Sequence, residues 1–152
     1  MKKLLLLSLL ATPFLTPIAD AKPAKKTAMA AKVNWRASFP AALAEAKRTG
    51  KPIFVDFYTT WCGPCKYLDA VTYKHPKFVA ESKKWVMVKV DAEKGAANVN
   101  LAKKFKIDGY PSMIFLQSDG KETDRAVGGY PPELLVPKMK KAGEKAGGGK
   151  SI

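Results

Sequence analysis

The chain has 152 residues, of which 47% are apolar and 26% are charged, and its formal net charge is +14. This length allows one compact domain with a hydrophobic core and is short for two. The composition is that of an ordinary globular protein, which excludes both wholesale disorder and a protein with many membrane spans.

Residues 1–21 differ in character from the rest of the chain. Lys2 and Lys3 precede a leucine-rich stretch at 4–15, and the small-residue triplet 19–21 ends at Ala21. A short basic start, an apolar stretch of this length and a small-residue cleavage site are typical of a secretory signal peptide. We therefore predict a signal peptide at 1–21, cleavage near Ala21, and a periplasmic or secreted mature protein. The alternative is an uncleaved anchor, for which the stretch is short compared with the roughly 20 residues of a membrane-spanning helix.

Lysine-rich segments flank the expected domain on both sides. Residues 22–32 are mainly Ala and Lys, and residues 143–152 are rich in Gly and Lys. We interpret the first as a linker and the second as a flexible tail, which leaves 33–142 for the domain. Because many of the lysines lie in these flanks, and because export separates the protein from nucleic acids, we expect no nucleic-acid partner. No sequence signal predicts an oligomer.

Helix and strand patterns alternate within the domain. Ser38 and Pro40 open a helical pattern that ends at Gly50. A β-branched and aromatic run at 53–58 then predicts a buried central strand. Further helices are predicted at 63–73, 76–83, 98–105 and 131–142, and further strands at 86–90, 112–116 and 123–127. This order, with a turn at 118–120, predicts a single α/β domain with a mixed central sheet flanked by helices.

Two cysteines with two residues between them follow the predicted central strand. Cys62 falls at the N-terminus of the next predicted helix, where unpaired backbone N–H groups and the helix dipole stabilise a thiolate. We assign Cys62 as the nucleophile. Cys65, one turn further along and expected to be more covered, is assigned to resolve the mixed disulfide. Pro64 fits the first turn of the helix and, with Gly63, connects the two cysteines.

Metal binding, haem attachment and a structural bridge are the alternatives to disulfide exchange for this cysteine pair. A zinc site needs about four ligands, and His75 is the only further strong nitrogen or sulfur donor, so we predict no metal. Haem attachment needs a histidine where Lys66 stands, so we predict no cofactor. The open alternative is a partner-binding module in which Cys62 and Cys65 form only a structural bridge. A bridge over so short a loop stabilises the folded state little.

The chain resembles the thioredoxin family. Residues 55–57 and 61–66 match the strand and the active-site turn of that family in type and spacing. Residues 109–112 resemble its segment with a cis proline that faces the cysteines, and residues 128–129 resemble its turn before the last helix. The resemblance covers about 33–142 and implies a thioredoxin fold.

In detail, the chain is more similar to the exported thioredoxin-like domains of bacterial thiol:disulfide interchange proteins. There, a pair like Lys51 and Pro52 opens the strand, and a segment like 75–78 follows the active-site helix. Tyr58 and Tyr110 depart from the residues that are common in thioredoxins. Both positions border the cysteines, so the resemblance does not define the substrate.

The resemblance implies roles for further residues. Asp56 lies in an otherwise apolar strand, where burial would raise its pKa and suit it to exchange a proton with Cys65. Lys89 matches the lysine near that carboxylate in the family and would tune it, unless it faces solvent. The resemblance implies that substrate is bound by Trp61, Gly63, Pro64, Tyr110 and Pro111.

The function implied by the resemblance is that of a thiol-disulfide oxidoreductase whose partners are protein disulfides or dithiols. Gly63 and Pro64 between the cysteines resemble thioredoxin, which favours reduction of substrates. A membrane-bound electron donor would keep such a protein reduced in an oxidising compartment.

Overall fold

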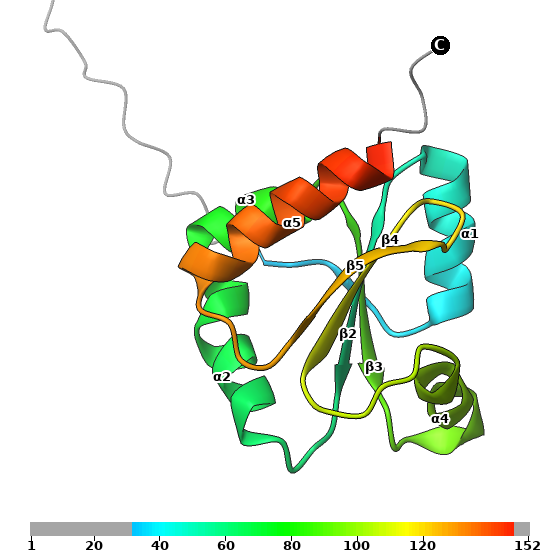
Figure 1. Cartoon of the computed structure of the whole chain (residues 1–152), viewed down its shortest axis with the longest axis vertical. Coiled ribbons are helices and arrows are strands. Elements are labelled where there is room, and N and C mark those ends of the chain that lie inside the picture. The colour runs from blue at the N-terminus through cyan, green and yellow to red at the C-terminus, as the bar shows by residue number, and fades with distance from the viewer. Residues whose placement is uncertain (1–31, 148–152) are drawn as a thin grey trace, which may run out of the picture.

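The computed structural model describes residues 32–147 (Figure 1). The predicted signal peptide, the predicted linker up to residue 31, and residues 148–152 of the predicted tail lie outside the described residues. The elements in chain order are β1 (Trp35–Arg36), α1 (Phe39–Thr49), β2 (Ile53–Tyr58), α2 (Gly63–Ala70), the short 3₁₀ helix η1 (Thr72–Lys74), α3 (Pro76–Ser82), β3 (Val86–Asp91), α4 (Gly95–Lys104), β4 (Ser112–Leu116), β5 (Glu122–Val127) and α5 (Pro132–Gly147).

The strands form one sheet in the order β1-β3-β2-β4-β5. It is a mixed sheet, as the sequence predicts. The central strand β2 pairs in parallel with β3, where Asp56 is opposite Lys89, and antiparallel with β4, where Asp56 is opposite Met113. β1 pairs in parallel with β3 over only two residues. It was not predicted, because two residues are too few to show a strand periodicity.

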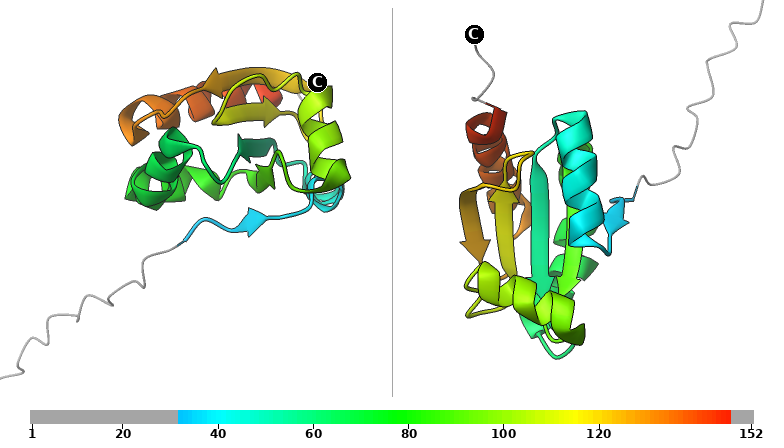
Figure 2. Two further views of the ribbon diagram at one scale, coloured as in Figure 1. Left: turned by 90° about the horizontal axis from the view of Figure 1, so that it is seen from below. Right: turned by 90° about the vertical axis from the view of Figure 1, so that its right-hand side faces the viewer.

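Two hydrophobic layers cover the two faces of the sheet, because successive residues of a strand point to opposite faces. Val55 of β2 packs in the layer formed with α1 and α4, whereas Phe54 packs in the layer formed with α2, α3 and α5. Figure 2 shows α1 and α5 on opposite sides of the sheet. Asp56 has the parity of Phe54, so its side chain lies on the face covered by α2.

Local signals fix α1 as predicted. The hydroxyl of Ser38 accepts a hydrogen bond from the backbone N–H of Ala41, and Gly50 ends the helix with φ of 71°, a conformation that glycine adopts without strain. No helix within residues 32–147 is both long enough and apolar enough to cross a membrane.

Three helices differ from their predicted bounds by three residues or more. α2 ends at Ala70, because the buried Thr72 leaves the helical path and its hydroxyl donates to the carbonyl of Tyr130 at 2.8 Å. α4 begins at Gly95, three residues before its predicted start. α5 continues to Gly147, so the start of the predicted tail at residue 143 is wrong. A Cβ atom on Gly143 would lie 3.2 Å from the ring of Trp85, so close packing holds this extra turn against the domain.

Candidate active site

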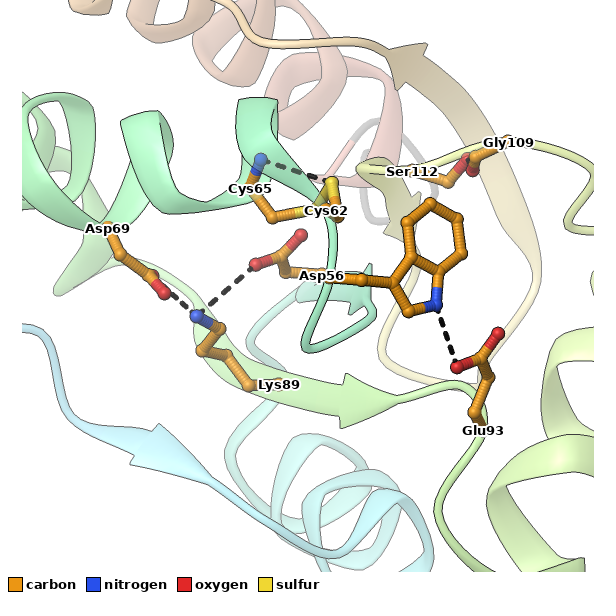
Figure 3. Close-up of a disulfide and its surroundings, with 9 residues drawn as sticks. Asp56, Cys62, Cys65, Asp69, Lys89, Glu93, Gly109 and Ser112 are labelled. Atoms are coloured by element: carbon orange, nitrogen blue, oxygen red, sulfur yellow. Dashed lines mark hydrogen bonds and ion pairs between the residues drawn. A yellow bond between two sulfur atoms is a disulfide. The ribbon is translucent and has the colours of Figure 1, made fainter.

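The two cysteines form a disulfide where β2 leads into α2 (Figure 3). Cys62 is the N-cap residue of α2, and its Sγ accepts the backbone N–H of Cys65 at 3.2 Å. Pro64 occupies the first turn of the helix, where its missing N–H costs no intrahelical hydrogen bond. The same N–H group and the helix dipole would stabilise a thiolate on Cys62 once the disulfide is reduced.

The two cysteines are almost equally covered, with exposed fractions of 3% for Cys62 and 4% for Cys65. The expectation that Cys65 is more covered is therefore wrong, because in the disulfide the two bonded sulfurs share one environment. The position of each cysteine in the helix, not its exposure, distinguishes the two. Gly63 and Pro64 between them are exposed.

Asp56 lies buried in β2, with 1% of its surface exposed. In Figure 3 its carboxylate lies between the disulfide and the ammonium of Lys89. Loss of solvation raises the pKa of Asp56 from 3.8 to about 7, although the positive charge of Lys89 partly offsets this effect. Among residues 32–147, Asp56 Oδ1 has no hydrogen-bond partner, and neither does the buried hydroxyl of Tyr73. Asp56 can therefore take up and release a proton near neutral pH.

Lys89 stands between two carboxylates. Its Nζ is 3.8 Å from Asp56 Oδ2 and donates a hydrogen bond to Asp69 Oδ1. The rings of Tyr58, Tyr73 and Trp35 surround the ammonium, with centroids at 4.6, 5.6 and 5.7 Å. The side chain is 19% exposed, which excludes the alternative of a solvent-facing lysine.

Asp69 was not predicted as a site residue. It lies four residues after Cys65 on α2, a spacing that places both on one face of the helix. That spacing is the signal that could have indicated it. Its carboxylate, half exposed, binds Lys89 more closely than Asp56 does.

Replacing Asp69 with asparagine is expected to lower the pKa of Asp56 below about 7. The change removes the closer anionic partner of Lys89 and one negative charge near Asp56, and both effects favour the ionised form of Asp56. The pKa can be followed by NMR of the ¹³C-labelled carboxyl carbon of Asp56. Replacement of Glu133, an exposed carboxylate in the first turn of α5, with glutamine is the matched control. An unchanged or higher pKa in the Asp69 variant would show that Asp69 does not hold Lys89 away from Asp56.

Trp61 and Tyr110 form an aromatic rim beside the disulfide. The two rings meet edge to face with centroids 5.9 Å apart, and Trp61 is 65% exposed. The indole N–H of Trp61 donates to Glu93 Oε2 at 2.9 Å. Glu93 was not predicted, because this contact depends on how the loop after β3 lies against the active-site turn. The Tyr110–Pro111 peptide bond is cis, as the resemblance implies.

The turn at 128–129 lies directly against the active-site helix. A Cβ atom on Gly129 would lie 3.3 Å from Cβ of Pro64, so a side chain there would press on the residue between the cysteines. Gly128 has φ of 107°, which favours glycine. The structure therefore explains why both positions are glycine. From the sequence, only the resemblance to the family indicates this turn.

This site has the chemistry of disulfide exchange. A cysteine pair that can close at a helix N-terminus, above an acid with a pKa near 7, can pass two electrons to or from another disulfide. Among the described residues, no group of three or more His, Cys, Asp or Glu side chains is placed to hold a metal ion. The fold and the site define a thiol-disulfide oxidoreductase.

More specifically, the chain belongs to the thioredoxin-like family, whose family model matches residues 34–118. The predicted resemblance is thus confirmed. A thioredoxin from Mycoplasmoides gallisepticum is 40% identical over 93 residues, which cover 60% of this chain and 85% of that protein.

Two further similarities concern disulfide-exchange proteins. The thiol:disulfide interchange protein DsbD of Klebsiella pneumoniae is 33% identical over 101 residues, which cover 65% of this chain but only 17% of DsbD. The solution structure of a putative disulphide-isomerase from Bacteroides thetaiotaomicron is 38% identical with a TM-score of 0.64. That alignment covers 76% of this chain and 96% of the other.

Proposed function

We propose that this oxidoreductase is exported and reduces disulfides in proteins, and that a membrane-bound electron donor returns it to the dithiol form. The observation that carries the proposal is the Cys62–Cys65 disulfide at the start of α2 with the buried Asp56 beside it. This arrangement provides both a stabilised thiolate and a proton acceptor. The exposed Gly63 and Pro64 and the rim of Trp61 and Tyr110 would form the surface that receives the substrate.

In the proposed reaction the reduced protein starts with a thiolate on Cys62. This thiolate attacks one sulfur of the substrate disulfide, forms a mixed disulfide and releases the other substrate sulfur as a thiolate. Asp56 then accepts the proton of Cys65, and the Cys65 thiolate attacks Cys62 Sγ. The mixed disulfide breaks, the second substrate sulfur leaves, and two electrons have passed to the substrate. The protein is left with the disulfide seen in the structure.

The sequence supports two parts of this proposal, the export of the protein and the transfer of electrons to the substrate. The apolar stretch at 4–15 with its basic start has the pattern of an export signal. The similarity to part of DsbD, a thiol:disulfide interchange protein, favours a protein that takes part in a chain of disulfide exchanges. The Gly-Pro pair between the cysteines favours reduction, as in the thioredoxin family.

Trapping of the mixed disulfide tests the proposal. Replacing Cys65 with serine removes the sulfur that resolves the mixed disulfide, so this variant should hold substrate proteins on Cys62. We expect adducts that run as larger species on non-reducing gels, disappear with dithiothreitol, and form with proteins of the exported compartment. The matched variant with serine at Cys62 should form fewer than about one tenth as many, because Cys65 lies inside the helix beyond the stabilising N-terminus.

Two results would count against the proposal. Equal adducts from both variants would show that Cys62 is not the preferred nucleophile. Absence of adducts from the Cys65 variant, with its Cys62 thiol shown to be free, would favour the binding module. The direction of electron transfer is tested separately by the reduction potential of the Cys62–Cys65 disulfide. A value near the roughly −270 mV of thioredoxin supports a reductant, and one near the roughly −120 mV of a strong oxidant contradicts it.

A further inference from the structure

Five cationic side chains gather at the end of the sheet that lies away from the disulfide. Four of them line a shallow groove of about 210 Å³, and the fifth, on the last turn of α1, lies with two of these four around Glu45. We call this cluster the basic end; it consists of Lys32, Arg36, Arg48, Lys51 and Lys83.

Most of this charge is not neutralised within the described residues. Glu45 lies among the cations, but Arg36 already holds it through two hydrogen bonds of 2.6 and 2.9 Å. Within residues 32–147, no carboxylate lies within salt-bridge distance of the other four, all of which are exposed. Lys51 Nζ donates to the backbone carbonyl of Lys83 at 3.0 Å, which holds the Lys51 ammonium beside the Lys83 backbone without neutralising its charge.

We propose that the basic end binds the surface of an anionic phospholipid bilayer. Three of its four unpaired cations are lysines, whose ammonium groups act as point charges on flexible stems and do not require a partner of fixed geometry. Lipid phosphates are mobile within their layer and can move to such charges, and each cation near the surface adds to the attraction. A rigid acidic protein would instead have to match the spacing of the cations.

The sequence before the described residues is also basic. The described chain begins at Lys32, which is part of the basic end, and Lys22, Lys25 and Lys26 precede it closely in the sequence. Several lysines in a short segment are typical of juxtamembrane binding to anionic lipid. Charge complementarity thus favours a bilayer over a single bound anion.

The position of the basic end fits the disulfide chemistry. Lys51 precedes β2 and Cys62 follows it, so the two lie beyond opposite ends of the central strand (Figure 1). A molecule that binds lipid through the basic end would keep the disulfide directed away from the bilayer, where soluble proteins, and any part of a membrane-bound donor that extends from the bilayer, can reach it.

Co-sedimentation with vesicles tests this inference. It rests on the proposed function only in using residues 22–152 as the mature chain, which include every described helix and strand. We expect this chain to bind vesicles with phosphatidylglycerol in phosphatidylcholine, and not vesicles of phosphatidylcholine alone, with binding that weakens as salt rises. Changing both Lys51 and Lys83 to glutamine should lower the partition coefficient roughly 30-fold, since each surface cation contributes about fivefold.

A matched pair separates the basic end from net charge. Lys103 and Lys104 are exposed near the end of α4. α4 follows β3 whereas Lys83 precedes it, so these two lysines lie toward the other end of the sheet. Changing both to glutamine removes the same charge from a surface outside the basic end. We expect this pair to lower binding by less than about threefold. Equal losses in both double variants, or no binding of the unaltered chain to phosphatidylglycerol vesicles, would overturn the inference. Insulin reduction by the same samples reports separately on the proposed function.

Discussion

Replacing Asp56 with asparagine is expected to slow disulfide reduction while stabilising the oxidised fold. Asparagine cannot accept the proton of Cys65, so kcat/KM for insulin reduction at pH 7.5 should fall by about 10- to 100-fold. In the unaltered protein the rate should rise as pH increases through about 7, where Asp56 ionises. The variant should lose this rise. Rates measured from pH 5.5 to 9 with dithiothreitol as electron donor provide the test.

The effect on stability has the opposite sign. The pKa of Asp56 is higher in the folded chain, at about 7, than its ordinary value of 3.8, so folding favours the protonated form. The stability from this group is complete below about pH 4 and is lost as pH rises through 7, because a charge must then stay buried. This loss amounts to about 4 kcal/mol at most. Asparagine removes this loss, but its buried amide without full hydrogen bonding costs about 1–3 kcal/mol.

The oxidised Asp56 variant should therefore be more stable than the unaltered protein by about 1–3 kcal/mol at pH 8, and no more stable at pH 4. Urea unfolding at the two pH values measures the difference. Asp119, exposed in the turn between β4 and β5, provides the matched control, because its change to asparagine should alter neither rate nor stability appreciably. A variant that is faster, or less stable at pH 8, would contradict the role of Asp56 as a buried proton acceptor.

Replacing Phe54 with alanine is expected to destabilise the domain by about 3–5 kcal/mol. Phe54 is fully buried in β2. Its ring meets those of Phe115, Phe78 and Tyr73 at centroid distances of 5.4, 6.0 and 6.4 Å, each close to edge-to-face. The change removes these contacts and leaves a cavity that three different elements would have to close.

Urea unfolding of the oxidised Phe54 variant at pH 7 measures this loss. Leucine at the same position keeps much of the apolar volume and should cost clearly less than alanine. A loss below about 1 kcal/mol for alanine would show that the surrounding rings can collapse into the space, and that this layer is less closely packed than the structure indicates.

Elements with local signals were predictable from the sequence. α1 has its cap at Ser38 and its stop at Gly50, and the bounds of β2 and β4 follow from runs that are apolar except at Asp56 and Ser112. β1 and the last turn of α5 were not predictable, because packing rather than sequence pattern holds them. Trp35 of β1 packs on Tyr73 at 5.0 Å, and Gly143 of α5 packs on Trp85.

The site shows the same division. Cys62 and Cys65 could be identified from their spacing and from the helix that they open, and Asp56 from the resemblance together with its place in an apolar strand. The helical spacing from Cys65 could indicate only that Asp69 shares a face with that cysteine, whereas its contact with Lys89, like that of Glu93 with Trp61, joins distant parts of the chain and could not be predicted. The register between β2 and β3 brings Lys89 beside Asp56. The position of Asp69 on α2 brings its carboxylate to Lys89.

The position of Asp56 between β3 and β4 has a consequence for the growing chain. β2 is synthesised before either neighbour, and its second edge stays unpaired until residues 112–116 have joined the sheet. Until then water can reach the Asp56 carboxylate, so we expect its pKa to stay near the ordinary value. A nascent chain can therefore expose both cysteines before Asp56 has the raised pKa that makes it a proton acceptor near neutral pH. The proton acceptor of this site belongs to the completed sheet, not to the segment around the cysteines.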